Sequence, residues 1–359
     1  MALSSYRLTR YLFISPVLSQ YRIRNFSTKP PKYSEGPPPD SVLKPRYLSE
    51  SSLIRAPYET DLSKVDVAMV GVPFDLALTH RPGTRFGPKE LRVQSGNQLR
   101  AINQFTNVCP HSTALRVRDV GDVPIDTPFD IIGAHKCIEE FYTKLNLLGI
   151  IPISAGGDHS VSLPILRALG KNGPVGMVHI DAHADTGEAY QGFKFSHGSP
   201  FKIAVEDGVL DPKRTIQIGI RGTVSRTDYW QFSYDSGMRV MMMEEFYKMV
   251  HSSAGIQSVV DEIFRVCGKD QPTYLSFDID AIDSTFAPGT GTPEIGGILP
   301  IEAQMLVREL TDLNLIGGDL VEVSPPYDPS GNTALLGAQL LFEISCVIVE
   351  SLIKRKSLS

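Results

Sequence analysis

An apolar run over residues 175–180 is followed directly by the sequence DAHAD at residues 181–185. A short run that is apolar throughout is typical of a buried strand in a parallel sheet. In extended chain, alternate side chains point to the same face, so Asp181, His183 and Asp185 should line up on one side as the strand ends. The sequence therefore predicts three potential metal ligands at the carboxyl end of a buried strand.

Two further segments repeat this arrangement. The segment YLSFDID places Asp278 and Asp280 on one face at the end of a second apolar strand. The segment GGDHS places His159 in a turn that follows a third strand-like run. Four carboxylates and two imidazoles at three strand ends exceed what one metal ion needs. We interpret them as a two-metal hydrolytic centre.

From about residue 66, strand-like and helix-like patterns alternate along the chain. The expected strands cover residues 65–73, 150–154, 175–181, 215–220, 273–280 and 316–323, and the expected helices cover 128–148, 161–169, 200–205, 256–266, 301–313 and 335–354. Thr127 is expected to cap the helix over 128–148. This alternation predicts an α/β fold with a mainly parallel sheet covered on both faces, in one domain over residues 51–359. Ligands of such sheets bind outside the carboxyl ends of the strands, where the three clusters fall.

The first 34 residues contain no Asp or Glu but several Arg, Lys and Ser. This composition is typical of a mitochondrial transit peptide, which we predict over residues 1–26, and it implies a matrix location. A disordered basic tail is the alternative. Residues 27–50 are rich in proline and are expected to form an extended linker.

The composition is that of a soluble globular protein with a sizeable core. The net charge is −5, and no cluster of Lys and Arg indicates a nucleic-acid partner. The four cysteines are widely spaced without a CxxC motif, so we expect free thiols. The apolar run over residues 334–353 is interrupted by Gln339, Glu343 and Glu350, which predicts a packed helix instead of a membrane span.

The ligand types indicate which metal the predicted centre binds. Carboxylate and imidazole donors without thiolates suit Mn²⁺ better than a structural Zn²⁺ site. Two divalent ions that share a water lower its pKa, which makes a hydroxide nucleophile available near neutral pH. Four carboxylates would balance the charge of two such ions, so the centre tolerates a cationic reacting group.

The segments GGDHS, DAHAD and SFDID resemble, in this order, the three metal-binding motifs of the ureohydrolases, the family of arginases and agmatinases. The resemblance extends from about residue 66 to residue 350. It implies a three-layer α/β/α fold, two Mn²⁺ ions per subunit, a homo-oligomer (a hexamer), and hydrolysis of a guanidino substrate to urea and an amine. It also implies that Asp181 and Asp278 bridge the ions. The first ion would be bound by His159, Asp181, Asp185 and Asp278, and the second by His183, Asp181, Asp278 and Asp280.

The same resemblance assigns catalytic roles. Glu294, in TGTPE, would accept hydrogen bonds from the substrate guanidinium and orient it. His197, in SHG, would pass a proton to the leaving amine. Asp185 is an alternative proton carrier. An exposed loop glutamate and a loop histidine without function are the alternatives for Glu294 and His197. His179 is expected to lie in the core or to support a ligand without binding metal. Glu322, at the end of a strand on the same side, either supports the site or has no role in it.

The loop over residues 186–195 lacks the pattern with which arginases bind the α-amino and α-carboxylate groups of arginine. The segments IGIRG and APGTGTPE resemble the agmatinase branch, so we expect agmatine as substrate, with 4-guanidinobutanoate as the alternative. Glu188 offers a partner for a distal amine, and Lys194 and Arg221 offer partners for a distal carboxylate. An inactive, metal-stabilised scaffold or regulatory subunit is a further alternative, as is a hydrolase of formimino substrates.

Overall fold

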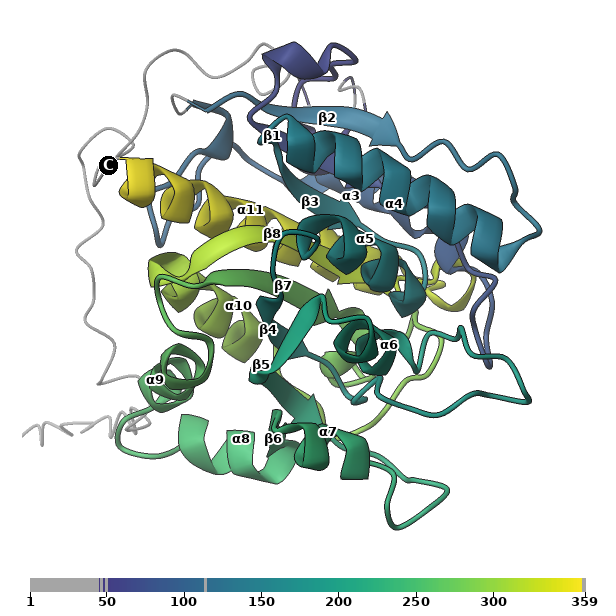
Figure 1. The fold of residues 1–359 in the computed structure, drawn as a ribbon. Helices are drawn as coiled ribbons and strands as arrows, with labels where there is room; N and C mark the ends of the chain where they lie inside the picture. Colours follow the sequence, from purple (N-terminus) through teal and green to yellow (C-terminus); the bar gives the residue numbers. More distant parts are fainter. Residues whose placement is uncertain (1–44, 46–47, 49–50, 113–114, 357–359) are drawn as a thin grey trace, which may run out of the picture.

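The structure is a computed structural model that describes residues 45, 48, 51–112 and 115–356 (Figure 1). The predicted transit peptide over residues 1–26, and all of the predicted linker except residues 45 and 48, lie outside the described residues.

The core of the fold is an 8-stranded sheet in the order β2-β1-β3-β8-β7-β4-β5-β6, in which every neighbouring pair is parallel. The strands are β1 (Val67–Gly71), β2 (Val117–Asp122), β3 (Ile151–Ala155), β4 (Val175–Ile180), β5 (Leu210–Ile220), β6 (Arg239–Met242), β7 (Pro272–Asp278) and β8 (Asn314–Val321). The central strands are mostly apolar because both of their faces are buried, with a few buried polar residues among the apolar ones.

Helices cover both faces of this sheet (Figure 1). One face packs against α4 (Ile131–Leu147), α5 (Ser162–Leu169) and α6 (Pro200–Glu206), and the other against α3 (Gly87–Gln98), α8 (Met243–Val250), α9 (Ile256–Cys267), α10 (Pro300–Arg308) and α11 (Asn332–Lys356). A short helix, α7 (Gln231–Ser236), precedes β6. The prediction of a three-layer α/β/α fold is therefore confirmed.

Some elements differ from those expected. The first helix of the predicted set begins at Ile131, because Asp130 and not Thr127 accepts the N–H of Ile132 at its N-terminus. The sequence analysis did not find α3, α7, α8, β2 and β6. Strand β2, with the sequence VRDVGD, lies at the edge of the sheet and lacks an apolar run, and β6 has only 4 residues.

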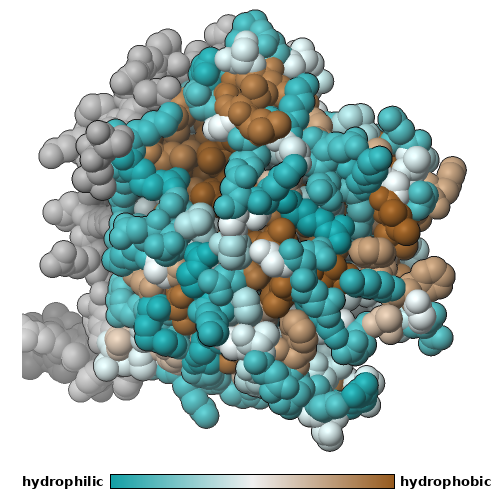
Figure 2. Space-filling model, viewed as in Figure 1, coloured by the Kyte–Doolittle hydropathy of each residue, from teal (hydrophilic) through white to brown (hydrophobic). Residues whose placement is uncertain are grey.

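Helix α11 is long and apolar enough to cross a membrane by length and composition alone. In the fold it packs against β8 and α10, and 78% of its most apolar window is buried. This agrees with the prediction of a packed helix. On the face shown in Figure 2, apolar side chains form small patches among polar ones. The four cysteines are free thiols.

The strand order brings together segments that are far apart in sequence. Strands β3, β8, β7 and β4 are consecutive in the sheet. The segment GGDHS follows β3, DAHAD follows β4, and SFDID lies at the end of β7. Ile180 pairs with Phe277, so the next residues, Asp181 and Asp278, lie side by side at the same level. The carboxyl ends of the central strands therefore form one site.

Candidate metal centre

His159 lies at the centre of the buried part of this site. Its Nδ1 atom lies 3.0 Å from Asp181 Oδ2, 3.0 Å from Asp185 Oδ2 and 3.2 Å from Asp278 Oδ2. The four side chains come from the ends of three different strands, and all are buried. The sequence motifs for the first metal ion thus converge on one point.

The hydrogen bonds of His159 test whether a metal ion fits there. Ser276 Oγ donates to Asp319 Oδ1 at 2.8 Å, so it accepts the Nε2–H of His159, also at 2.8 Å. Nδ1 is buried and has no hydrogen-bond partner, although three carboxylate oxygens surround it. An ion shared by all four donor atoms fits this geometry better than an N–H aimed at one oxygen.

The electrostatics of these carboxylates lead to the same conclusion. Burial, together with the charges of Asp280 and Asp181, raises the pKa of Asp278 well above its usual range. Burial disfavours the charged form of His159, but Asp181, Asp185 and Asp278 outweigh it and raise its pKa well above the ordinary value. The cluster therefore holds either protons or cations, and divalent cations relieve the repulsion between its carboxylates.

A second group of ligands adjoins the first. His183 Nδ1 lies 3.0 Å from Asp280 Oδ2 and 3.6 Å from Asp181 Oδ1. Asp181 thus faces His159 with one oxygen and His183 with the other. Asp278 Oδ1 accepts the backbone N–H of Asp280 at 2.8 Å. Five of the six predicted ligands fall into two groups that share Asp181, and Asp278 adjoins both groups through His159 and the backbone of Asp280.

His179 lies beneath the ligands, on the same strand face as Asp181. Gln217 Nε2 donates to His179 Nδ1 at 3.2 Å, so the proton of His179 is on Nε2. His179 Nε2–H in turn donates to Asp181 Oδ2, 2.7 Å away. Although its position also suits a ligand, these contacts make His179 a support for Asp181. This matches the expectation from the sequence.

A wholly buried carboxylate supports His159 from below. Asp319 Oδ1 accepts a hydrogen bond from Ser276, and Oδ2 accepts hydrogen bonds from Tyr274 at 2.9 Å and Ser162 at 2.6 Å. Three hydroxyl groups thus satisfy a carboxylate that has no cationic partner among these contacts. Sequence reasoning missed Ser276 and Asp319. The available signal was a polar residue inside each of two otherwise apolar strands.

His197 lies beside the metal ligands and is held on both ring nitrogens. Its Nδ1 lies 3.1 Å from Glu322 Oε1, and its Nε2 lies 2.7 Å from Thr79 Oγ1. Burial disfavours the imidazolium, but Glu322 outweighs burial and raises the pKa of His197 to about 9. At neutral pH this side chain therefore carries a proton that it can give away.

Glu322 links His197 to the metal centre. It is buried, has a left-handed backbone conformation with φ of 63°, and accepts the backbone N–H of His159 at 2.8 Å. Its second oxygen, Oε2, is buried without a hydrogen-bond partner. Of the two roles that the sequence left open for Glu322, the structure therefore gives it the supporting one, and leaves one acceptor atom free.

Glu294 lies at the open side of the second group of ligands. Its Oε1 lies 3.9 Å from His183 Nε2, and its side chain is 28% exposed. Gly222, with φ of 86°, packs against this carboxylate, where a Cβ atom would lie 2.6 Å from it. Only glycine allows this approach without strain, so the chain after β5 defines one wall of the space around Glu294.

A model of the arginase family matches residues 65–346. This chain belongs to the arginase family. The guanidinopropionase of Pseudomonas aeruginosa is 46% identical over 315 residues, which cover 88% of this chain and 96% of that protein. The mitochondrial agmatinase of Gallus gallus is 43% identical over 312 residues, which cover 87% of this chain and 89% of that protein.

A solved arginase-family structure agrees with the fold. The proclavaminate amidino hydrolase from Streptomyces clavuligerus superposes with a TM-score of 0.79 at 34% identity, covering 86% of this chain and 100% of that chain. The family membership that the three motifs predicted is thus confirmed. The chain is an enzyme of the ureohydrolase class.

The residues predicted to bind the distal end of the substrate of this arginase-family enzyme have other partners. Glu188 accepts a hydrogen bond from Lys202, and Lys194 Nζ lies 3.6 Å from Glu206 Oε2. The assignment of Arg221 needs correction. Its guanidinium donates to backbone carbonyl groups only, on all three nitrogens, so it has no donor left for a substrate carboxylate.

Proposed function

We propose that this chain hydrolyses a linear guanidino compound to urea and an amine at a centre of two Mn²⁺ ions. The observation that carries the proposal is the convergence of three buried carboxylates on the unpartnered Nδ1 atom of His159, next to the His183–Asp280 pair. Nothing but a cation neutralises such a cluster without protonating it. Family membership supports the same chemistry.

The proposed metal ligands combine the three motifs with the two groups of side chains in the structure. We assign the first ion to His159, Asp181, Asp185 and Asp278, and the second ion to His183, Asp181, Asp278 and Asp280. Held by these residues, two such ions would supply the Lewis acidity that makes a water nucleophilic near neutral pH. The four aspartates would balance their charge. Ser276, which accepts a hydrogen bond from His159, and His179, which donates one to Asp181, hold the ligands in place.

His197 supplies the proton for the leaving amine. Glu322 and Thr79 hold its ring, and Glu322 keeps it protonated at neutral pH. A positioned imidazolium next to the reacting group is an effective general acid. Asp185, which borders the same cluster, remains the alternative proton carrier.

Two carboxylates can receive the guanidinium group. Glu294, assigned from its motif, faces the metal centre from the open side. Glu322 has a buried and unpartnered Oε2 that faces Gly291, in the same loop as Glu294, where a Cβ atom would lie 3.2 Å from it. A planar guanidinium forms parallel hydrogen bonds with a carboxylate, which fixes its carbon relative to the nucleophile. We assign this binding to Glu294 and propose Glu322 as the second acceptor.

The substrate candidates are agmatine, which would give putrescine, and a guanidino acid such as 4-guanidinobutanoate, which would give the amino acid. The similarity to an agmatinase supports the first, and the similarity to a guanidinopropionase supports the second. Glu188 and Lys194 lie in surface ion pairs, which contribute little energy and exchange partners readily. Either pair can therefore open to bind a distal amine or a distal carboxylate.

A substrate panel tests the proposal. Urea release is measured for arginine, agmatine, 3-guanidinopropanoate and 4-guanidinobutanoate with the Mn²⁺-loaded protein. We expect a linear substrate without an α-amino acid group to have the highest kcat/KM. Release of urea from none of them would support the inactive scaffold, and arginine as the best substrate would refute the branch assignment.

We further propose that residues 1–26 direct the protein to the mitochondrial matrix and are removed, and that the mature chain forms a homo-oligomer. The acid-free, Arg-rich composition of this segment and the likeness to a mitochondrial agmatinase support the location. Import into isolated mitochondria, followed by sequencing of the new N-terminus, tests the first point. Light scattering of the purified mature protein tests the second, with a hexamer as the expected result.

A further inference from the structure

Arg221, at the end of β5, has its guanidinium enclosed by backbone carbonyl groups. It is 9% exposed, and its donors reach carbonyl oxygens on three separate segments of the chain. The acceptors are Gly219 at 3.3 Å, Asp280 at 2.7 Å, Ala281 at 3.2 Å, Ile282 at 3.4 Å, Glu294 at 3.0 Å and Ile295 at 3.0 Å. All five N–H groups of the guanidinium can be satisfied within this shell.

These acceptors belong to the parts of the chain that surround the second metal ion. Asp280 is one of its assigned ligands, and Glu294 is assigned to the guanidinium of the substrate. The backbone N–H of Arg221 also donates to Ala182 O at 2.9 Å, beside the ligand His183. One residue therefore joins the three segments that supply His183, Asp280 and Glu294.

The first metal ion has a different support. His159 is held by Ser276 through its ring and by Glu322 through its backbone N–H. None of these contacts involves Arg221. The two halves of the centre are thus supported by separate sets of hydrogen bonds, apart from the shared ligands.

We propose that Arg221 is a positioning residue that sets the place of the Glu294 carboxylate relative to the His183–Asp280 half of the metal centre. The inference rests on the proposed function. Lysine keeps the charge but has three donors on one atom, so it cannot reach carbonyls on both sides as the planar guanidinium does. Arg221→Lys should therefore release the Glu294 segment and the Asp280 turn from each other.

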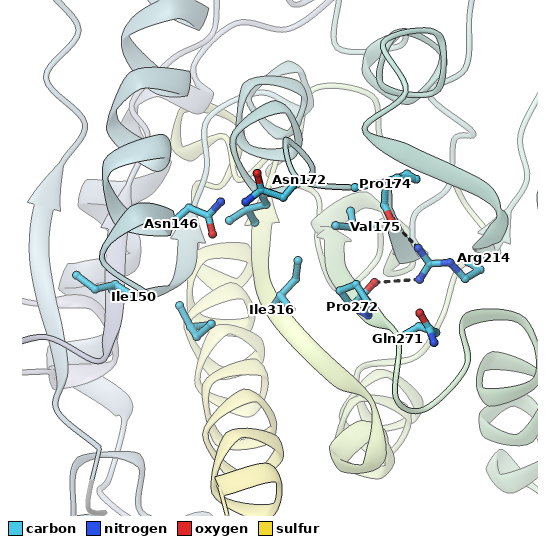
Figure 3. Close-up of a pocket in the computed structure, with 13 residues that line it drawn as sticks. Asn146, Ile150, Asn172, Pro174, Val175, Arg214, Gln271, Pro272 and Ile316 are labelled. Atoms are coloured by element: carbon cyan, nitrogen blue, oxygen red, sulfur yellow. Dashed lines mark hydrogen bonds between the residues drawn. The ribbon is translucent and has the colours of Figure 1, made fainter. Parts of the chain in front are cut away.

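Arg214 provides a matched control. Its guanidinium also donates to backbone carbonyls, Pro174 O at 2.6 Å and Pro272 O at 3.2 Å (Figure 3). It donates as well to the carboxylate of Asp211, at 2.9 Å. Arg214 lines a pocket of about 360 Å³ at the amino ends of the strands. The metal centre lies at the carboxyl ends, on the opposite side of the fold. Arg214→Lys thus makes the same chemical change at a distance from the site.

The experiment compares Arg221→Lys and Arg214→Lys in Mn²⁺ binding to the apo-protein and in KM and kcat. Arg221→Lys should weaken the binding of one of two ions by roughly 10- to 100-fold, the usual effect of removing a support of a metal ligand. KM should rise, and Arg214→Lys should change neither. In a Glu294→Gln background, Arg221→Lys should add no further rise in KM, because it acts on substrate binding through Glu294.

Equal losses in the two lysine variants would overturn the proposal, as would unchanged ion binding and KM in Arg221→Lys. Arg221→Gln is the second variant, and failure of both Arg221 variants to fold would show a purely structural role. Wild-type protein that binds two ions but releases no urea would refute the proposed function. In that case the comparison of ion binding would still decide the role of Arg221.

Discussion

Replacing Ser276 with alanine should weaken Mn²⁺ binding at the His159 half of the centre while leaving the fold intact. The serine hydroxyl accepts the Nε2–H of His159 and donates to Asp319, both at 2.8 Å, and all three side chains are buried. The contact with Ser276 fixes the proton of His159 on Nε2 and thereby keeps Nδ1 facing the carboxylates. In Ser276→Ala the imidazole loses this contact. Nδ1 is the atom assigned to the metal ion.

The size of the effect follows from the groups left unpaired. A buried donor without a partner costs about 1–3 kcal/mol, so the free energy of unfolding of the apo-protein should fall by that amount. Asp319 keeps its hydrogen bonds from Tyr274 and Ser162. Affinity for the first ion should fall by roughly 10- to 100-fold, because the ring of His159 is then free to turn or to change its tautomer.

Ser162→Ala is the matched control for this prediction. It also removes a buried hydroxyl that donates to Asp319, but Ser162 joins His159 through its backbone N–H, which donates to His159 O and is kept in alanine. Denaturant unfolding of the apo-proteins should show a smaller loss of stability in Ser162→Ala, which leaves no buried donor unpaired. Equilibrium dialysis with metal analysis should show weaker Mn²⁺ binding only in Ser276→Ala. Equal Mn²⁺ affinities in the two variants would refute the argument that Ser276 acts through His159.

Three other predictions concern the site. His197→Ala should lower kcat by roughly 10²- to 10⁴-fold with near-normal Mn²⁺ content, and loss of manganese in metal analysis would contradict its role as a proton donor. Because its folded pKa lies near 9 and its ordinary value is 6.5, the stabilising contribution of His197 is complete below pH 6.5 and is lost as the pH rises through 9. Glu322→Gln should remove this pH dependence of stability, measured by denaturant unfolding, and should make kcat fall at a lower alkaline pH. An unchanged alkaline pH profile of kcat would count against the His197–Glu322 pair. Asp181→Ala and Asp278→Ala should each remove both ions, and two ions per chain in either variant would rule out bridging by that residue.

The sequence alone determined the types and the local order of the metal ligands. The motifs DAHAD and FDID place their ligands directly after β4 and at the end of β7, as expected, but not in the extended chain that was expected to align them. The chain bends after Ile180, Asp185 has a left-handed φ of 51°, and Asp280 lies in a short 3-10 helix over Ile279–Ala281. Apolar runs of strand length also predicted the central strands of the sheet. Both inferences depend on neighbours in sequence, which is why they needed no tertiary information. The edge strand β2 and the helix α3 lack such runs and were missed.

Only the tertiary structure decided which strand ends meet and which polar side chains pair. The order β3-β8-β7-β4 brings His159 within hydrogen-bond distance of Ser276, which is 117 positions away in the chain. Thr79 and His197 are 118 positions apart and meet in the same way. Arg221 resembled a free cation in the sequence, yet the fold surrounds it with carbonyl groups from two distant segments. A charged side chain carries no local sign of its partner, because that partner is set by the packing of the strands and the loops that follow them.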